Sequence, residues 1–247
     1  MKKLFTLIAT AALVLGSCTS EKPEWAEGTV AKDARISLNI TNDQVMNTRA
    51  VSNVADASNW YITVGENSQI QVSSLGSKTY EAGSYTIKVG NYTNEAAALA
   101  ANDAYYEGSA TETLSKGNNA VTVACGKAKN CRVKADLSNL TDFAAITEVK
   151  LTASQGSTSR VLSNGNLGYF SAGTTISYQL DYKYNGTSKT AITNSITTPA
   201  AATEYQVKVV TNSNGTISLT ITYDTEFTTT EVETITIDAA TGAKVDA

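Results

Sequence analysis

Cysteines at positions 18, 125 and 131 are the residues of this 247-residue chain with the widest range of chemistry open to them. A thiol can act as a nucleophile, a metal ligand, a disulfide partner or an acylation site. The chain contains no histidine, so triads of the Ser-His or Cys-His kind and zinc sites that need imidazole are excluded. Acylation and disulfide formation remain, and we expect no metal site and no cofactor.

Cys18 follows a cationic start, an apolar run over residues 4–15 and the small residues Gly16 and Ser17. This order is similar to a bacterial lipoprotein signal, in which the leader is removed and the cysteine becomes the lipidated N-terminus. Twelve residues of helix rise about 18 Å, which is too short for a hydrocarbon core of about 30 Å. We predict a signal peptide over residues 1–17, lipidation by palmitate at Cys18 and a tether over residues 18–34.

The residue after Cys18 and the overall charge bear on where such a lipoprotein would lie. An aspartate there would resemble an inner-membrane retention signal, whereas the chain has Thr19, which favours the outer membrane. The net charge is −4 without a cluster of Lys and Arg, so nucleic acid is not an expected partner. We expect a lipid anchor in the membrane through Cys18 and protein or glycan partners at the cell surface. Whether Cys18 faces the periplasm or the outside is left open.

Short strands are the elements that would position these residues. Ile36, Leu38 and Ile40 alternate with polar residues, which is the period of a half-buried strand. The same alternation recurs over residues 85–89, 121–125, 131–137, 149–153, 176–184 and 233–238. Only Asn94–Asp103 has a helix-like composition, sufficient for one or two turns. We predict an all-β fold of two tandem antiparallel β-sandwiches of the immunoglobulin or transthyretin type, over residues 35–127 and 128–247.

The hairpin between Tyr205 and Tyr223 allows a prediction of register. A two-residue loop at Asn214-Gly215 would keep the apolar faces of the two strands apart. A three-residue loop over residues 213–215, with Gly215 in the left-handed region, aligns them instead. That loop predicts the pairs Val209 with Leu219, Val207 with Ile221, and Tyr205 with Tyr223.

Cys125 and Cys131 each lie on the apolar side of a predicted strand, and two arrangements are open. If residues 126–130 turn back as a hairpin loop, the two thiols could form a disulfide in an oxidising compartment. If the same residues run as an extended linker, the two Cα atoms lie about 20 Å apart and no bond forms. We favour the second arrangement, with each cysteine facing the core of its own domain.

Several segments resemble a known family when taken together with the leader. They are Glu81-Ala82-Gly83-Ser84-Tyr85-Thr86-Ile87, Tyr105-Tyr106-Glu107-Gly108, Val121-Thr122-Val123 and Gly168-Tyr169-Phe170. The chain is similar over most of its mature length to uncharacterised surface lipoproteins from Bacteroidales. The resemblance implies tandem β-sandwiches and a cell-adhesion role, with a more distant likeness to fimbrillin-type pilins.

The likeness to pilins suggests a possible cleavage site at Thr48-Arg49-Ala50. Fimbrillin-type pilins are made as lipoproteins and then cut after an arginine, which frees a groove for a donor strand from the next subunit. Arg49 lies between the first predicted strand and Trp60-Tyr61. A cut before Ala50 would therefore detach the first strand, whereas the simpler interpretation of Arg49 is a loop residue.

Three classes of function follow from these patterns. Catalysis is disfavoured because the carboxylates are scattered without a spacing that selects a pair. Glycan binding requires exposed aromatic rings, for which Trp60, Tyr61, Tyr105 and Tyr106 are the candidates, although core packing explains any one of them more simply. Adhesion or structural interaction requires only a stable, tethered pair of sandwiches with edges or loops free for partners. We therefore expect a non-catalytic surface lipoprotein.

Overall fold

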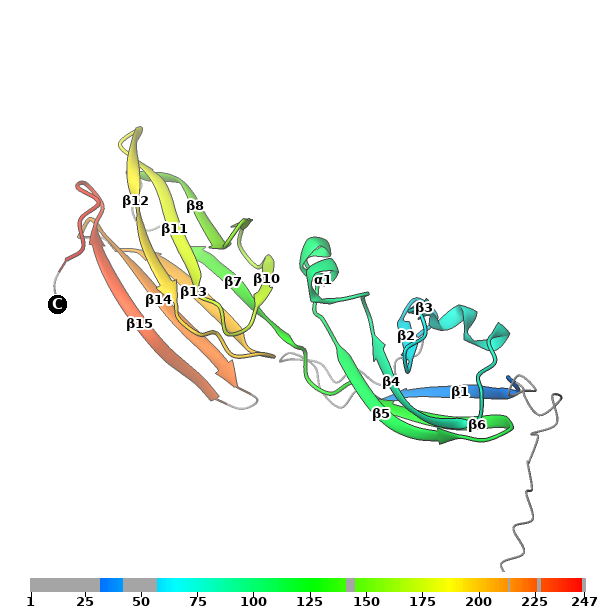
Figure 1. Ribbon diagram of the computed structural model, residues 1–247. Helices are drawn as coiled ribbons and strands as arrows, with labels where there is room; N and C mark the ends of the chain where they lie inside the picture. Colours follow the sequence, from blue (N-terminus) through cyan, green and yellow to red (C-terminus); the bar gives the residue numbers. More distant parts are fainter. Residues whose placement is uncertain (1–31, 42–56, 141–144, 213, 226–227, 246–247) are drawn as a thin grey trace, which may run out of the picture.

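The computed structural model in Figure 1 describes residues 32–41, 57–140, 145–212, 214–225 and 228–245. Cys18, Arg49 and Ala50 lie outside these ranges. The described residues form β-strands in separate sheets, together with one short α-helix and one 3-10 helix. The expected all-β class is confirmed.

Two sheets make up residues 34–125, which we call the N-terminal half. Its elements are β1 (Ala34–Thr41), β2 (Tyr61–Val64), β3 (Ile70–Gln71), the 3-10 helix η2 (Val72–Ser77), β4 (Gly83–Gly90), α1 (Glu95–Ala101), β5 (Glu107–Leu114) and β6 (Gly117–Ala124). One sheet has the order β3-β2-β4-β5 and the other pairs β1 with β6. The inner residues of both sheets form one cluster of buried side chains.

Residues 130–239, the C-terminal half, form a sheet of five strands facing a sheet of four. The strands are β7 (Asn130–Asn139), β8 (Ile146–Gln155), β9 (Thr158–Leu162), β10 (Leu167–Ser171), β11 (Ile176–Tyr184), β12 (Thr187–Ile196), β13 (Glu204–Thr211), β14 (Thr216–Thr225) and β15 (Thr228–Asp238). Their orders are β10-β7-β13-β14-β15 and β12-β11-β8-β9. The helix α1 lies between the two halves (Figure 1).

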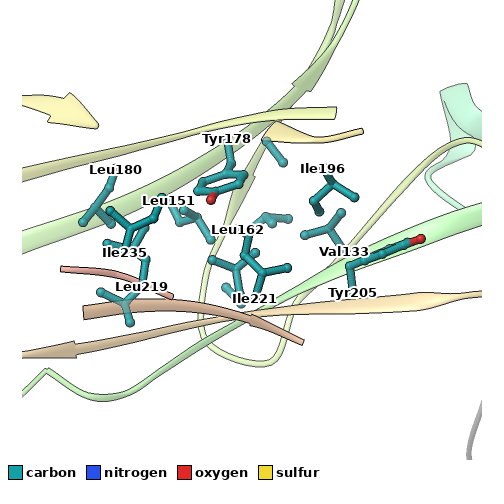
Figure 2. Packing of buried hydrophobic residues seen from close by; sticks show 14 of the residues in the cluster. Val133, Leu151, Leu162, Tyr178, Leu180, Ile196, Tyr205, Leu219, Ile221 and Ile235 are labelled. Atoms are coloured by element: carbon teal, nitrogen blue, oxygen red, sulfur yellow. The ribbon is translucent and has the colours of Figure 1, made fainter. Parts of the chain in front are cut away.

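The core of the C-terminal half forms where its two sheets face each other. Figure 2 shows Leu151 and Leu180 of one sheet packed towards Leu219 and Ile235 of the other. Leu151, Leu180 and Leu219 are fully buried, and burying a leucine side chain stabilises the fold by about 1.5–3 kcal/mol. Because the two halves have separate cores, each sheet pair is held by its own apolar contacts.

Two strand pairs are parallel, which the purely antiparallel prediction did not include. β1 runs parallel to β6, and β7 runs parallel to β13. Parallel neighbours need a long connection between them, and here these connections consist of several strands. Alternation within single strands cannot show which distant strand becomes the neighbour. The first strand also begins at Ala34, one residue before the predicted start, and Ala34 is fully buried.

The predicted register of the hairpin β13–β14 is confirmed. Tyr205 pairs with Tyr223, Val207 with Ile221 and Val209 with Leu219. The backbone nitrogens of Asn212 and Gly215 donate to Thr216 and Asn212 at 2.8 and 3.0 Å, and Gly215 has φ 84°. The left-handed glycine is therefore present as the three-residue loop requires, whereas Ser213 lies outside the described residues.

Gly108 shows why the segment Tyr105-Tyr106-Glu107-Gly108 ends in glycine. A Cβ atom at this position would lie 2.1 Å from the carbonyl oxygen of Ala124 and 3.0 Å from Cα of Cys125. Only a residue without a side chain lets β5 approach the end of β6 this closely.

We predict that Gly108→Ala lowers the free energy of unfolding by about 1–3 kcal/mol or more, because the backbone of β6 must move away. Urea unfolding followed by tryptophan fluorescence measures the effect. Gly76→Ala is the matched control, since no heavy atom lies within 4 Å of a Cβ at Gly76. Equal unfolding midpoints for the two variants would contradict the close approach.

Candidate functional site

The short helix α1 carries an asparagine that joins the two halves. Asn94 begins the helix by accepting a hydrogen bond from Ala97 N, and Asn102 ends it in the left-handed conformation at φ 56°. Asparagine tolerates this conformation better than most residues. In this position the Asn102 amide reaches β10, where it donates to Leu167 O and accepts from Tyr169 N, both at 2.9 Å.

Asn130 makes the reverse connection, from the first residue of β7 to the N-terminal half. Its side chain accepts from Tyr105 N at 3.0 Å and donates to Asp103 O at 2.9 Å. Its own carbonyl accepts from Ala202 N at 2.9 Å. Asn130 is fully buried, so these bonds replace water and fix the position of the amide.

Apolar and cationic contacts surround the two amides. Ala104, Ala128 and Tyr169 form a small buried cluster of their own. Arg160 donates to Leu99 O of α1 and, through Nε, to Tyr169 O at 3.3 Å. Its guanidinium carbon lies 6.0 Å from the centre of the Phe170 ring. We call this set of contacts the junction, and it joins the two halves through side-chain hydrogen bonds and apolar packing.

The sequence interpretation did not identify the junction. It considered residues 126–130 only as a hairpin loop or an extended linker, yet Ala128 and Asn130 are buried and Lys129 N donates to Tyr105 O at 2.8 Å. An asparagine after an alanine-rich stretch is a signal for a helix end at Asn102. No local signal marks Asn130, because its partners lie 25 and 27 residues away.

The two described cysteines are free and buried, so the disulfide considered for Cys125 and Cys131 is not formed. Cys125 belongs to the N-terminal core and Cys131 to the C-terminal core. Residues 126–130 pass from one core to the other instead of turning back as a hairpin loop, which is the physical reason. Burial raises the pKa of Cys125 to about 11 and that of Cys131 to about 12, so both thiols stay protonated at neutral pH.

The four candidate aromatic residues have different environments. Tyr105 is only 6% exposed, and its hydroxyl donates to Glu107 Oε2 at 2.5 Å. Burial, followed by this carboxylate, raises the pKa of Tyr105. The burial of Tyr105 agrees with the simpler interpretation of this candidate as a packing residue and leaves little of its ring exposed for stacking. Trp60, Tyr61 and Tyr106 are half-buried, and both Trp60 and Tyr106 pack on the N-terminal core.

The strand β1 completes the N-terminal core. It pairs with β6 along its whole length, from Ala34 with Gly117 to Thr41 with Ala124. On the other side, Ala34 forms an isolated bridge with Tyr80. Ile36 and Ile40 are each 7% exposed. β1 therefore supplies buried apolar side chains while its backbone is paired mainly along one edge.

No group of three or more Cys, Asp or Glu residues among the described residues could hold a metal ion. Within the part of the chain that the structure describes, no helix is long and apolar enough to cross a membrane.

The strand order defines a class of all-β protein with two facing pairs of sheets. The family model described as "Domain of unknown function (DUF4493)" matches residues 32–239, and the chain belongs to this family. The family resemblance noted from the sequence is thereby confirmed. No curated protein matches the chain.

Three solved structures are similar to the chain. A candidate cell-adhesion protein from Bacteroides ovatus is 11% identical over 83% of this chain and 97% of its own, with a TM-score of 0.41. A fimbrial assembly protein from Parabacteroides distasonis is 11% identical over 80% and 98%, with a TM-score of 0.43. A candidate adhesin from Bacteroides thetaiotaomicron is 10% identical over 83% and 100%, with a TM-score of 0.40.

We predict that Asn130→Ala lowers the free energy of unfolding by about 2–4 kcal/mol, because it leaves the buried Tyr105 N–H and the Asp103 carbonyl without partners. Urea unfolding of the full chain provides the measurement. Asn166→Ala is the matched control, since Asn166 is exposed and its side chain bonds only the nearby Ser163 hydroxyl. A cost for Asn130→Ala no larger than the control's would contradict the junction.

The buried thiols predict a loss of stability in alkali. An unfolded thiol titrates near pH 9, whereas folded Cys125 and Cys131 keep their protons to about pH 11 and 12. Their contribution is therefore complete below about pH 9 and is lost as the pH rises through 11 to 12. The free energy of unfolding between pH 8 and 11 should fall less steeply when both cysteines are replaced by alanine. Identical slopes would show that the thiols are not buried as described.

Proposed function

We propose that the protein is a non-catalytic outer-membrane lipoprotein, held by Cys18 at the cell surface, that acts in adhesion or structural interaction. The junction is the observation that carries this proposal. Hydrogen bonds of Asn102 and Asn130 run in both directions between the halves, and Arg160 adds a third connection. A protein that presents a binding surface at a fixed distance from its anchor benefits from such a restrained link.

The tether after Cys18 and the junction between the halves together support a role in presenting the C-terminal half to partners. The sequence between Cys18 and the first described residue is short and contains no periodic pattern, as in a tether. The C-terminal half begins 112 residues after Cys18, at Asn130. If the halves keep one orientation, the loops of the C-terminal half are presented away from the membrane. Binding of a partner then does not have to order a flexible linker between the halves, which reduces the entropy cost of binding.

The edge position of β1 favours a second candidate, a pilin-like subunit that is matured after Arg49. Ile36 and Ile40 enter the core, but the backbone of β1 is paired fully only with β6. A cut before Ala50 would leave this strand attached by non-covalent contacts alone. A strand from another copy with the same apolar alternation could then take its place beside β6.

The N-terminus of the mature protein distinguishes the two candidates. Mass spectrometry of the protein isolated from its own cells should find an acylated Cys18 as the N-terminal residue. Growth with labelled palmitate should label the protein, and Cys18→Ala should abolish the label, whereas the control Cys125→Ala should keep it because that thiol is buried.

Each outcome has a distinct meaning. An N-terminus at Ala50 that is lost in Arg49→Ala would support the pilin-like subunit in place of permanent anchoring. An unmodified chain that begins at Met1 would contradict both candidates. Protease treatment of intact cells should also degrade the protein, and full protection would contradict its display at the surface.

A further inference from the structure

A polar cavity of about 160 Å³ lies in the N-terminal half, beside the loop that leads into α1. Strands β2, β4 and β5 provide part of its wall and the turn before β3 provides another part. The side chains available to a ligand are those of Thr63, Gln69, Lys88, Tyr92, Thr93 and Glu107. Tyr105, a candidate from the sequence, also lines the cavity, whereas Trp60, Tyr61 and Tyr106 do not.

Internal hydrogen bonds position three of these side chains before any ligand arrives. The Tyr105 hydroxyl donates to one oxygen of Glu107 at 2.5 Å, which leaves the second oxygen open as an acceptor. Gln69 donates to Thr93 O at 3.3 Å. The Tyr92 hydroxyl donates to Asp103 Oδ2 at 2.9 Å and so fixes its ring at the cavity. Such preorganisation reduces the entropy cost of binding.

Lys88 provides donors that no other described group uses. Its side chain is exposed, and its ammonium group forms no ion pair or hydrogen bond with another residue of the described ranges. Glu107 lines the same cavity without pairing with it. A free ammonium group, a half-free carboxylate and an amide thus face one space, which supplies both donors and acceptors.

The size and charge of the cavity select a class of ligand. Pockets for drug-sized ligands have volumes of about 300–1,000 Å³. The volume of about 160 Å³ of this cavity therefore suits a single small ring. Lys88 and Glu107 balance in charge, and Asp103 behind Tyr92 adds one negative charge. The site therefore disfavours an anion. A neutral ring rich in hydroxyl groups matches the donors and acceptors, and the Tyr92 ring offers an apolar face for its C–H groups.

We propose that this cavity binds a neutral pyranose, as a free sugar or as the terminal unit of a glycan. Lys88 donates to ring hydroxyls, Glu107 and Gln69 accept from them, and Tyr92 packs against the ring. The proposal goes beyond adhesion in general by giving the chain a ligand class and a location for it.

Saturation-transfer NMR with the full chain, in a detergent without a sugar headgroup, tests the site directly. The probes are glucose, galactose, mannose and N-acetylglucosamine as neutral sugars, with glucuronic acid and sialic acid as anionic ones. We expect transfer to at least one neutral sugar and weaker transfer to the two acids. Transfer to none of the sugars, or a preference for the acids, would overturn the proposal.

Variants assign the binding to this cavity. Lys88→Ala and Gln69→Ala should each weaken binding by about tenfold through the loss of a hydrogen bond. Lys208→Ala and Gln179→Ala are matched controls, because both residues are exposed on strands of the C-terminal half, and they should bind as the unaltered chain does. Binding that survives both cavity variants would overturn the site. Loss of sugar binding would leave acylation at Cys18 unchanged, so the two proposals fail separately.

Discussion

The buried amide of Asn130 is the constraint on which the arrangement of this protein depends. It stands at the first position of β7, so it belongs to the backbone of the C-terminal half, yet its side chain binds only backbone groups of residues 103 and 105. A buried amide without partners would cost several kcal/mol, and one whose partners are in place rigidifies its surroundings. The two halves can therefore separate only by exposing these polar groups to water or leaving them unpaired.

The two cores and the junction have different roles in this arrangement. Each half obtains its stability from its own core, and the parallel pairs β1–β6 and β7–β13 join strands far apart in the sequence. The junction adds a small apolar cluster and several directional hydrogen bonds between the halves. This division explains how one chain can have two separate cores and still present its surfaces in a fixed relation.

The sequence predicted what local periodicity encodes. Alternation located most strands, and the requirement that the apolar faces of β13 and β14 meet predicted the register from Tyr205 to Val209 correctly. It could not predict the partner of β1, the burial of Tyr105 or the role of Asn130, because each depends on residues brought together by the fold. The polar cavity likewise combines β2, β4 and β5, whose spacing in the sequence carries no ligand motif.

The junction and the small polar cavity are consistent with the proposed role of a protein that is anchored through Cys18 and presents a surface to its partners. The restrained orientation of the halves is the central claim. Spin labels at Thr113→Cys in β5 and Ser177→Cys in β11 of a chain that also carries Cys18→Ala would test it most directly by electron-electron double resonance, since both positions are exposed and the buried Cys125 and Cys131 should not be labelled. The account predicts a single narrow distribution of distances between the labels. A broad distribution, as a flexible linker produces, would contradict it.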